Sequence, residues 1–469
     1  MENEVGVVTA KKEPLLPRWL KFLLILVGML FFLAAGTWVL LDIITRQDLR
    51  AALAEVEALA WPLTPGALYP EPIPDEENAA LLYQQAFAQL ALTNDEDVAI
   101  CTVDTLEAWS ALTEEEQDTV RRALKKNANY LMLLHQAVRL EKCQFDLRYS
   151  DGFAMLLPHL VEIRHAARVL QAAALVALTE GDTEQACQHW LDSVALARHT
   201  GDEKILISEL VRVACLSIST HTLESMVESG RLSDSQLAQA ASALEDFDLR
   251  PGLAESLRGE LAFARSIFTA SFTELEGMFR YGGPPDRFQL LLRSYCSPFA
   301  RPWRQHDQAT HLVLLKEGIE IAEQPYAASA SRRRQWEQKV PPTPHWRAPL
   351  TAMLLPALTR ASQAAAGGEA RRDLARTALA LERYRLAHGQ YPESLDALVP
   401  DILPEVPLDP FDGKPLRYVR SDRVAVYSIG EDLQDDSGSE EQGTSGRPRD
   451  IVFTLRQAPT PTEEAGDAD

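Results

Sequence analysis

The sequence has little of what identifies a nucleic-acid-binding protein or a familiar class of enzyme. Its formal net charge is -22, and the only compact basic cluster is residues 332–334. This balance opposes binding to a phosphate backbone, so we expect no nucleic-acid partner. The sequence also has no His-Glu-x-x-His or Gly-x-Ser-x-Gly motif, and no phosphate-loop or dinucleotide fingerprint. Sequence motifs therefore assign no residue a catalytic role.

Cysteine is also scarce, with an odd number of residues and no closely spaced pair. The five positions are Cys101, Cys143, Cys187, Cys215 and Cys296. Two of them, Cys187 and Cys215, fall within helical patterns, where a thiol packs as a small hydrophobic group. We predict a fold that does not depend on disulfides.

One long apolar run stands near the amino terminus. Phe22 to Leu41 carries no charge, and about 20 helical residues span about 30 Å, the thickness of a bilayer's hydrocarbon core. Four basic residues precede the run, which predicts a cytoplasmic segment at residues 1–21, a single transmembrane helix at residues 22–41 and a body outside the cytoplasm. That arrangement fits the inner membrane of a cell with a periplasm. A cleaved signal peptide ending near residues 34–36 and a buried core helix are the competing interpretations.

The next segments read as a linker followed by an α-helical body. Five prolines between residues 62 and 74 predict a Pro-rich linker at residues 42–74 that holds the body away from the membrane. Residues 75–341 predict stacked helical hairpins, with helices over residues 159–180, 183–199, 202–228 and 233–244. The hairpin around Gly181-Asp182 resembles one tetratricopeptide-type repeat, although no 34-residue period extends it. Two helices joined by a Gly-Asp turn are the other interpretation.

The carboxy-terminal region has the pattern of a small α+β unit at residues 342–456, followed by an acidic tail at residues 457–469 that we expect to be disordered. Apolar residues from Leu374 onward recur at helical spacing, and Gly389 with Pro392 then stops the helix. Three runs rich in Val, Ile, Tyr and Phe follow at residues 416–419, 424–429 and 451–455. They predict an antiparallel three-stranded sheet.

The order of the aromatic, Gly and Pro residues in this region is distinctive. It runs through Tyr384, His388-Gly389-Gln390-Tyr391-Pro392, Asp409-Pro410-Phe411-Asp412-Gly413 and Tyr427-Ser428-Ile429-Gly430. This order resembles the globular domain of the major pseudopilin of type II secretion systems, and the resemblance implies a long helix packed on an antiparallel sheet. A pseudopilin's apolar helix runs directly into its globular domain, whereas here it lies at residues 22–41. No Gly-Phe-Thr-Leu-x-Glu pattern occurs near Met1, so we do not carry over assembly into a filament.

Two groups of residues are candidate metal ligands. The pseudopilin resemblance implies calcium at the acidic loop, where the ligands would be Asp432, Asp435, Asp436 and Asp450. Neutralisation by Arg447 and Arg449, or a solvated acidic loop, are the alternatives. The second group is His159, Glu162 and His165, which contains one Glu-x-x-His half-site. A di-metal bundle needs two such half-sites, so we interpret this group as an ordinary helix face.

These patterns together predict a mainly α protein with a membrane anchor helix, stacked helical hairpins and a small pseudopilin-like α+β domain. Stacked helices offer broad surfaces for binding proteins. We therefore expect a noncatalytic, membrane-tethered scaffold with protein partners in the cell envelope. An accessory component of a type II secretion or pilus-like apparatus, and an exported enzyme of unknown class, are the alternatives.

Overall fold

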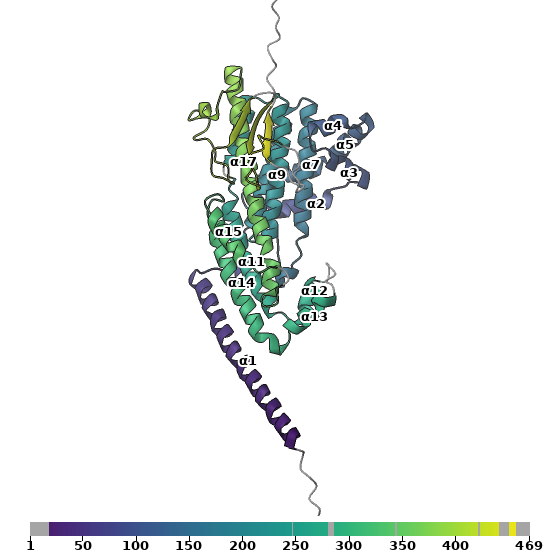
Figure 1. The fold of residues 1–469 in the computed structure, drawn as a ribbon. Coiled ribbons are helices and arrows are strands. Elements are labelled where there is room, and N and C mark those ends of the chain that lie inside the picture. The colour runs from purple at the N-terminus through teal and green to yellow at the C-terminus, as the bar shows by residue number, and fades with distance from the viewer. Residues whose placement is uncertain are drawn as a thin grey trace, which may run out of the picture.

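The computed structural model describes residues 18–455, except for residues 246, 280–285, 343–344, 421–422 and 440–449. The expected acidic tail, most of the expected cytoplasmic segment and the two loop arginines, Arg447 and Arg449, lie outside the described residues. The described chain is mainly helical and carries one small antiparallel sheet near its carboxy terminus (Figure 1).

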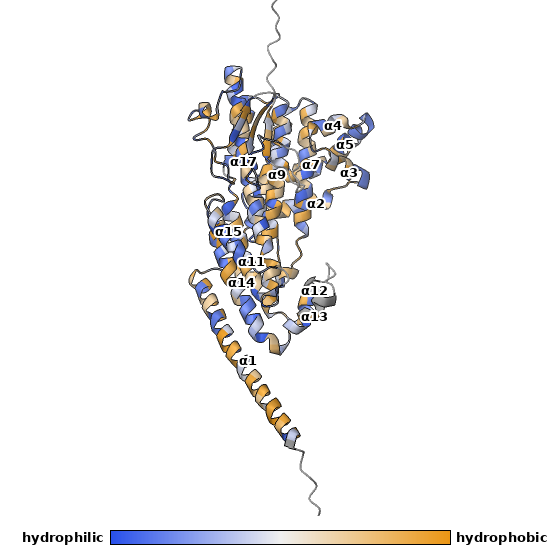
Figure 2. Cartoon of the chain, in the orientation of Figure 1, coloured by the Kyte–Doolittle hydropathy of each residue, from blue (hydrophilic) through white to orange (hydrophobic). Residues whose placement is uncertain are grey.

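Helix α1 (Arg18–Ala58) fits a single-pass membrane anchor. Its first half is apolar and projects from the body (Figure 2), and large side chains such as Phe31 and Phe32 are exposed along it. Helix α9 (Leu206–Glu228) is also long and apolar enough to span a bilayer, but most of its apolar segment is buried by other helices. We therefore interpret α9 as a core helix and α1 as the anchor.

The predicted linker at residues 42–74 is wrong over its first part, because α1 continues as far as Ala58. This second half of α1 packs against α14 (Arg301–Ala322) and buries Ala52 and Val56 in a shared apolar cluster. No proline occurs between Pro17 and Pro62, so no proline interrupts the helix before its end at Ala58. The segment that follows includes a short 3₁₀ turn, Pro65–Leu68, whose last side chain is buried in the body.

Polar contacts reinforce the attachment of the anchor to the body. Both carboxylate oxygens of Asp42 accept hydrogen bonds from the Arg301 guanidinium at 2.6 Å, and the Trp38 indole donates to the backbone oxygen of Phe299 at 2.8 Å. Bidentate arginine–carboxylate pairs fix the relative orientation of the two side chains as well as their distance. The body is thus held directly against the carboxy-terminal half of α1, without a flexible spacer.

The body between the anchor and the sheet is a stack of helices, and several predicted hairpins are confirmed. Helices α7 (Pro158–Thr179) and α8 (Thr183–His199) form the expected hairpin, in which Gly181 has a φ of +88° and the Asp182 side chain accepts from the backbone nitrogen of Gln185. The other helices of the body are α2 (Ala79–Gln89), α3 (Asn94–Thr102), α4 (Leu106–Ala111), α5 (Glu114–Lys126), α6 (Ala128–Ala137), α10 (Asp234–Glu245), α11 (Arg250–Thr269), α12 (Phe272–Phe279), α13 (Asp286–Tyr295), α15 (Ala330–Lys339) and α16 (Pro349–Leu354).

The predicted carboxy-terminal helix and strands are also confirmed. Helix α17 (Pro356–His388) begins well before Leu374 and ends at Gly389, which has a φ of +78°. The strands β1 (Arg417–Arg420), β2 (Val424–Ser428) and β3 (Ile451–Leu455) form an antiparallel sheet in the order β1-β2-β3. Val426 pairs with Tyr418 on one side and with Phe453 on the other.

The expected boundary near residue 342 does not separate two cores. Helix α17 packs on α9 and α10, and β3 contacts both α17 and α9. One apolar cluster contains Tyr83 and Trp190 of the body together with Leu379, Val426 and Phe453. Because these residues exclude water jointly, the carboxy-terminal α+β region and the helical body form one packed unit.

Candidate functional site

A cleft lies between α9, α17 and the edge strand β3 of the sheet. Its volume is about 750 Å³, within the range of ligand-binding clefts. Residues 105–107 at the start of α4 form one rim, and the loop after β2 forms another. The charged residues of its lining are Glu107, His221, Glu224, Glu228, Arg360, Arg371, Glu431 and Asp450.

Two adjacent glycines allow α17 to lie close to its neighbours below this cleft. A Cβ atom at Gly368 would come within 2.5 Å of a Leu249 methyl group and 3.3 Å of Val213 on α9. A Cβ atom at Gly367 would lie 3.3 Å from the Arg371 guanidinium. Arg371 donates to the Gly367 backbone oxygen at 3.2 Å. The missing side chains therefore let α17 approach α9 and let Arg371 lie along its own helix.

The floor of the cleft combines a histidine–carboxylate pair with a half-buried arginine. His221 Nδ1 lies 3.7 Å from Glu224 Oε2, and this interaction raises the pKa of His221 above its ordinary value despite partial burial. Burial lowers the pKa of Arg371, but a guanidinium keeps its charge at neutral pH. His221, Glu224 and Arg371 also line a smaller hollow of about 240 Å³ that adjoins the cleft. Both signs of charge are thus available to a ligand.

Strand β3 presents its outer edge to the cleft. It pairs with β2 on one side, while on the other the Thr454 backbone nitrogen donates to Glu224 Oε1 at 2.6 Å. Ile451, Val452 and Thr454 belong to the lining. An edge strand can hydrogen-bond an added extended chain, so the cleft has the chemistry to hold a peptide backbone as well as charged side chains.

The structure brings together only part of the acidic loop proposed to bind calcium. Asp450 is 1% exposed, and its Oδ2 accepts from the Gly438 backbone nitrogen at 2.7 Å, while its Oδ1 is buried without a hydrogen-bond partner. Burial and the nearby Asp436 and Asp435 carboxylates raise the pKa of Asp450. Asp432 instead lies at the surface and accepts from the Gln434 backbone nitrogen. Among the described residues, no three of these four carboxylates gather within 4.8 Å.

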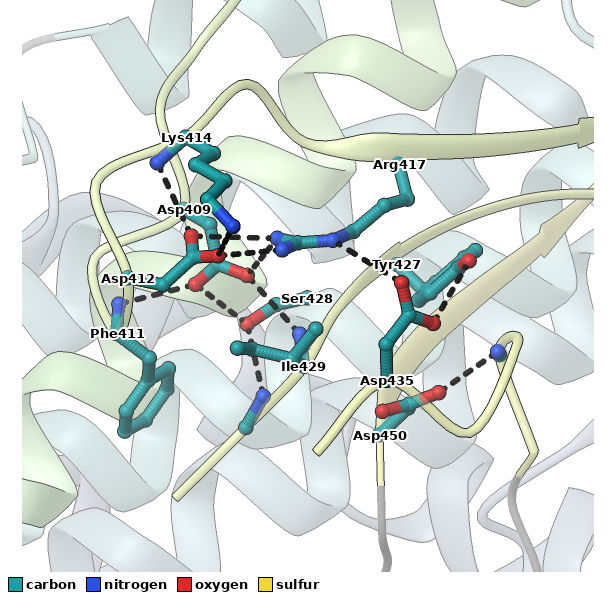
Figure 3. A network of polar contacts seen from close by, with 12 residues as sticks. Asp409, Phe411, Asp412, Lys414, Arg417, Tyr427, Ser428, Ile429, Asp435 and Asp450 are labelled. Carbon is teal, nitrogen blue, oxygen red and sulfur yellow. Dashed lines mark hydrogen bonds and ion pairs between the residues drawn. The ribbon is translucent and has the colours of Figure 1, made fainter. Parts of the chain in front are cut away.

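Arg417, which the sequence analysis did not single out, neutralises the buried carboxylate of Asp409 beside the acidic loop. Asp409 is fully buried and receives hydrogen bonds from Arg417 at 2.7 Å, the Ser428 hydroxyl at 2.8 Å and the Ile429 backbone nitrogen at 2.9 Å (Figure 3). Arg417 also bonds Asp412 and lies 3.7 Å from Asp435. Arg417 is thus the cation that joins the turn, the sheet and the acidic loop.

The candidate group on α7 separates into two different pairs. His159 is buried and its Nε2 lies 2.7 Å from Glu203 Oε1, whereas His165 Nε2 lies 2.7 Å from Asp97 Oδ1 on α3. The expectation of an ordinary exposed helix face is wrong at His159. No signal in the sequence brings Asp97 beside His165, because that contact depends on how α3 packs against α7.

Comparisons with family models, with curated proteins and with solved structures give no match to this chain. The lining residues of the cleft come from six separate parts of the sequence: the start of α4, α9, α17, Phe411, the loop after β2 and residues 450–454. No short motif could have indicated them. A functional interpretation therefore depends on the geometry of the cleft and of the anchor.

Proposed function

We propose that the chain is a noncatalytic scaffold, tethered to the inner membrane by α1, that binds an extended segment of a partner protein in the cleft beside β3. The observation that carries this proposal is the mixed-charge cleft of about 750 Å³ along an edge strand. A strand edge supplies backbone hydrogen bonds, and Arg360, Arg371 and the cleft carboxylates supply charge complementarity.

The orientation follows from the basic residues before the apolar run. Lys11, Lys12, Arg18 and Lys21 favour a cytoplasmic amino terminus, because positively charged flanks remain on the cytoplasmic side. The body and the cleft would then face the periplasm. The contacts of Asp42 and Trp38 with the body keep the cleft at a fixed distance from the bilayer.

The test is photo-crosslinking in intact cells with a photoreactive phenylalanine analogue placed at Glu107, on the cleft rim, or at Glu184, an exposed control position on α8. We expect a protein adduct at position 107 and none at position 184. Ala364→Trp fills the cleft and should abolish the adduct, and Arg371→Gln should weaken it, while circular dichroism shows that both variants fold. An adduct at position 107 that survives Ala364→Trp would contradict the proposal.

A role as an accessory component of a secretion or pilus-like apparatus is the second candidate. The arrangement of α17 on a sheet of order β1-β2-β3 favours it, because the pseudopilin resemblance implies a helix on such a sheet. Here the partner would use the opposite edge, β1, where Arg420 is partly exposed and bonds Glu393. Co-purification with secretion components that is lost in Arg420→Glu but kept in Ala364→Trp would favour this candidate.

A further inference from the structure

Three side chains with different metal-binding atoms meet at the contact between α3 and α7. Asp97 and Cys101 lie one helical turn apart on α3, and His165 reaches them from α7. Their ligand atoms all lie within 4.8 Å of one another. His165 Nε2 is 2.7 Å from Asp97 Oδ1, and Cys101 Sγ is 4.0 Å from the same oxygen. This is the one such group among the described residues.

We propose that Asp97, Cys101 and His165 bind a divalent transition metal ion of the zinc type, with solvent as the fourth ligand. A thiolate, an imidazole and a carboxylate are the donors that zinc prefers, whereas calcium and magnesium select oxygen alone. In a tetrahedral zinc site, neighbouring ligand atoms lie about 3.4–3.6 Å apart. Small side-chain rotations reach that spacing when the ion replaces the bond between His165 and Asp97.

The charges around the thiol determine how metal binding should depend on pH. Partial burial and the Asp97 carboxylate raise the pKa of Cys101, while the nearby Arg168 lowers it. A thiolate beside a carboxylate is unfavourable until a cation neutralises both. Metal binding therefore displaces the thiol proton to solvent, and its affinity should increase with pH. Asp97 and Cys101 are both solvent-accessible, which leaves an entry path and an open coordination position.

A metal at this position would join α3 to α7. Helix α4 follows α3 directly, and residues 105–107 at its start form a rim of the cleft. The metal would therefore fix one wall of the cleft relative to the core helices. The metal site does not depend on the function proposed for the cleft, because its ligands lie outside the cleft lining.

Cobalt is the probe for this site, because a thiolate bound to Co²⁺ gives a charge-transfer absorption band in the near ultraviolet. Titration of the full, reduced chain in detergent should produce this band with one Co²⁺ per chain, and Zn²⁺ should remove it. Cys101→Ser should abolish the band. Asp97→Asn and His165→Gln should each weaken Co²⁺ affinity about tenfold or more.

Cys296→Ser is the matched control, because it removes another partly accessible thiol and should leave the band unchanged. Circular dichroism verifies the fold of each variant. The absence of a band in the unmodified chain, or a band that persists in Cys101→Ser, would overturn the proposal. The three residues would then form only a hydrogen-bonded contact between two helices.

Discussion

Gly259 lets α11 lie against the backbone that leads into α9. A Cβ atom at this position would stand 1.8 Å from the Lys204 carbonyl oxygen, a distance that no side-chain rotation can relieve. Gly259→Ala should therefore lower the free energy of unfolding by about 3 kcal/mol, as overpacking against backbone does. Gly277→Ala is the control, because nothing lies within 4 Å of a Cβ there and alanine should stabilise the helix by about 0.5–1 kcal/mol. Equal effects in denaturant titrations of the two variants would contradict this account.

Arg417 compensates the fully buried carboxylate of Asp409. Arg417→Gln leaves that charge without its cation, and we expect the free energy of unfolding to fall by about 3 kcal/mol. Lys414→Gln, which removes an exposed charge near Asp412, should change the free energy of unfolding by less than about 0.5 kcal/mol. Denaturant titrations of the two variants measure this difference.

Thermal melting with and without calcium tests whether the acidic loop binds this ion. If Arg417 neutralises the loop, millimolar calcium should leave the melting temperature of the unmodified chain unchanged. A rise in melting temperature that Asp450→Asn removes would instead support the calcium prediction.

Buried histidines should make the protein less stable in mild acid. Burial lowers the pKa of His311, which is 2% exposed, to about 4, and lowers that of His199 to about 4 as well. Because an unfolded histidine titrates near 6.5, the unfolded state binds more protons between these values. The stability contribution is complete above pH 6.5 and is lost as the pH falls towards 4, by up to about 1.4 kcal/mol per pH unit for each histidine.

His311→Leu removes one of these two groups from apolar surroundings. We expect its free energy of unfolding to fall less steeply between pH 6.5 and pH 4 than that of the unmodified chain. His388→Leu, at an exposed position, should leave the slope unchanged. A slope in His311→Leu equal to that of the unmodified chain would show that burial of His311 does not set this pH dependence.

At the scale of elements, the sequence predicted local structure well and predicted contacts between distant segments poorly. The helix stop at Gly389, the turn at Gly181 and the strand-forming composition of the three runs act through neighbouring residues, so the sequence alone predicts them. The continuation of α1 against α14 depends on the pairing of Asp42 with Arg301, far apart in the chain. The cleft could not be predicted from the sequence for the same reason. His221 and Arg371 show no spacing signal and meet only when α9 packs on α17.

The carboxy-terminal region should not fold by itself. The sequence predicts a small α+β unit at residues 342–456, but α17 buries Leu374, Ala378 and Leu381 in the cluster that it shares with the body. Separated from α9 and α10, this face would be exposed to water, and a helix and three short strands retain too little core. The isolated segment should lack dispersed amide signals in nuclear magnetic resonance spectra. A folded, monomeric segment would instead support the predicted domain boundary near residue 342.

At the scale of the molecule, α1 joins the membrane to the body, and the cleft lies in the part of the body that is far from the apolar half of α1 (Figure 1). The apolar half of α1 lies at one end of the body, and the sheet beside the cleft lies towards the other end (Figure 1). A direct attachment without a spacer fixes both the height and the direction of the cleft. A partner anchored in the same membrane could then meet the cleft without a long search.

The central claim is that this cleft faces the compartment outside the cytoplasm. The most direct test is labelling of Glu107→Cys with a membrane-impermeant maleimide in intact cells, in a Cys101→Ser background that removes the exposed native thiol. The outer membrane, where present, is first permeabilised. We predict labelling before the inner membrane is lysed, with the unsubstituted Cys101→Ser chain giving a much weaker signal. Labelling of Glu107→Cys that appears only after lysis would place the cleft in the cytoplasm and contradict the account.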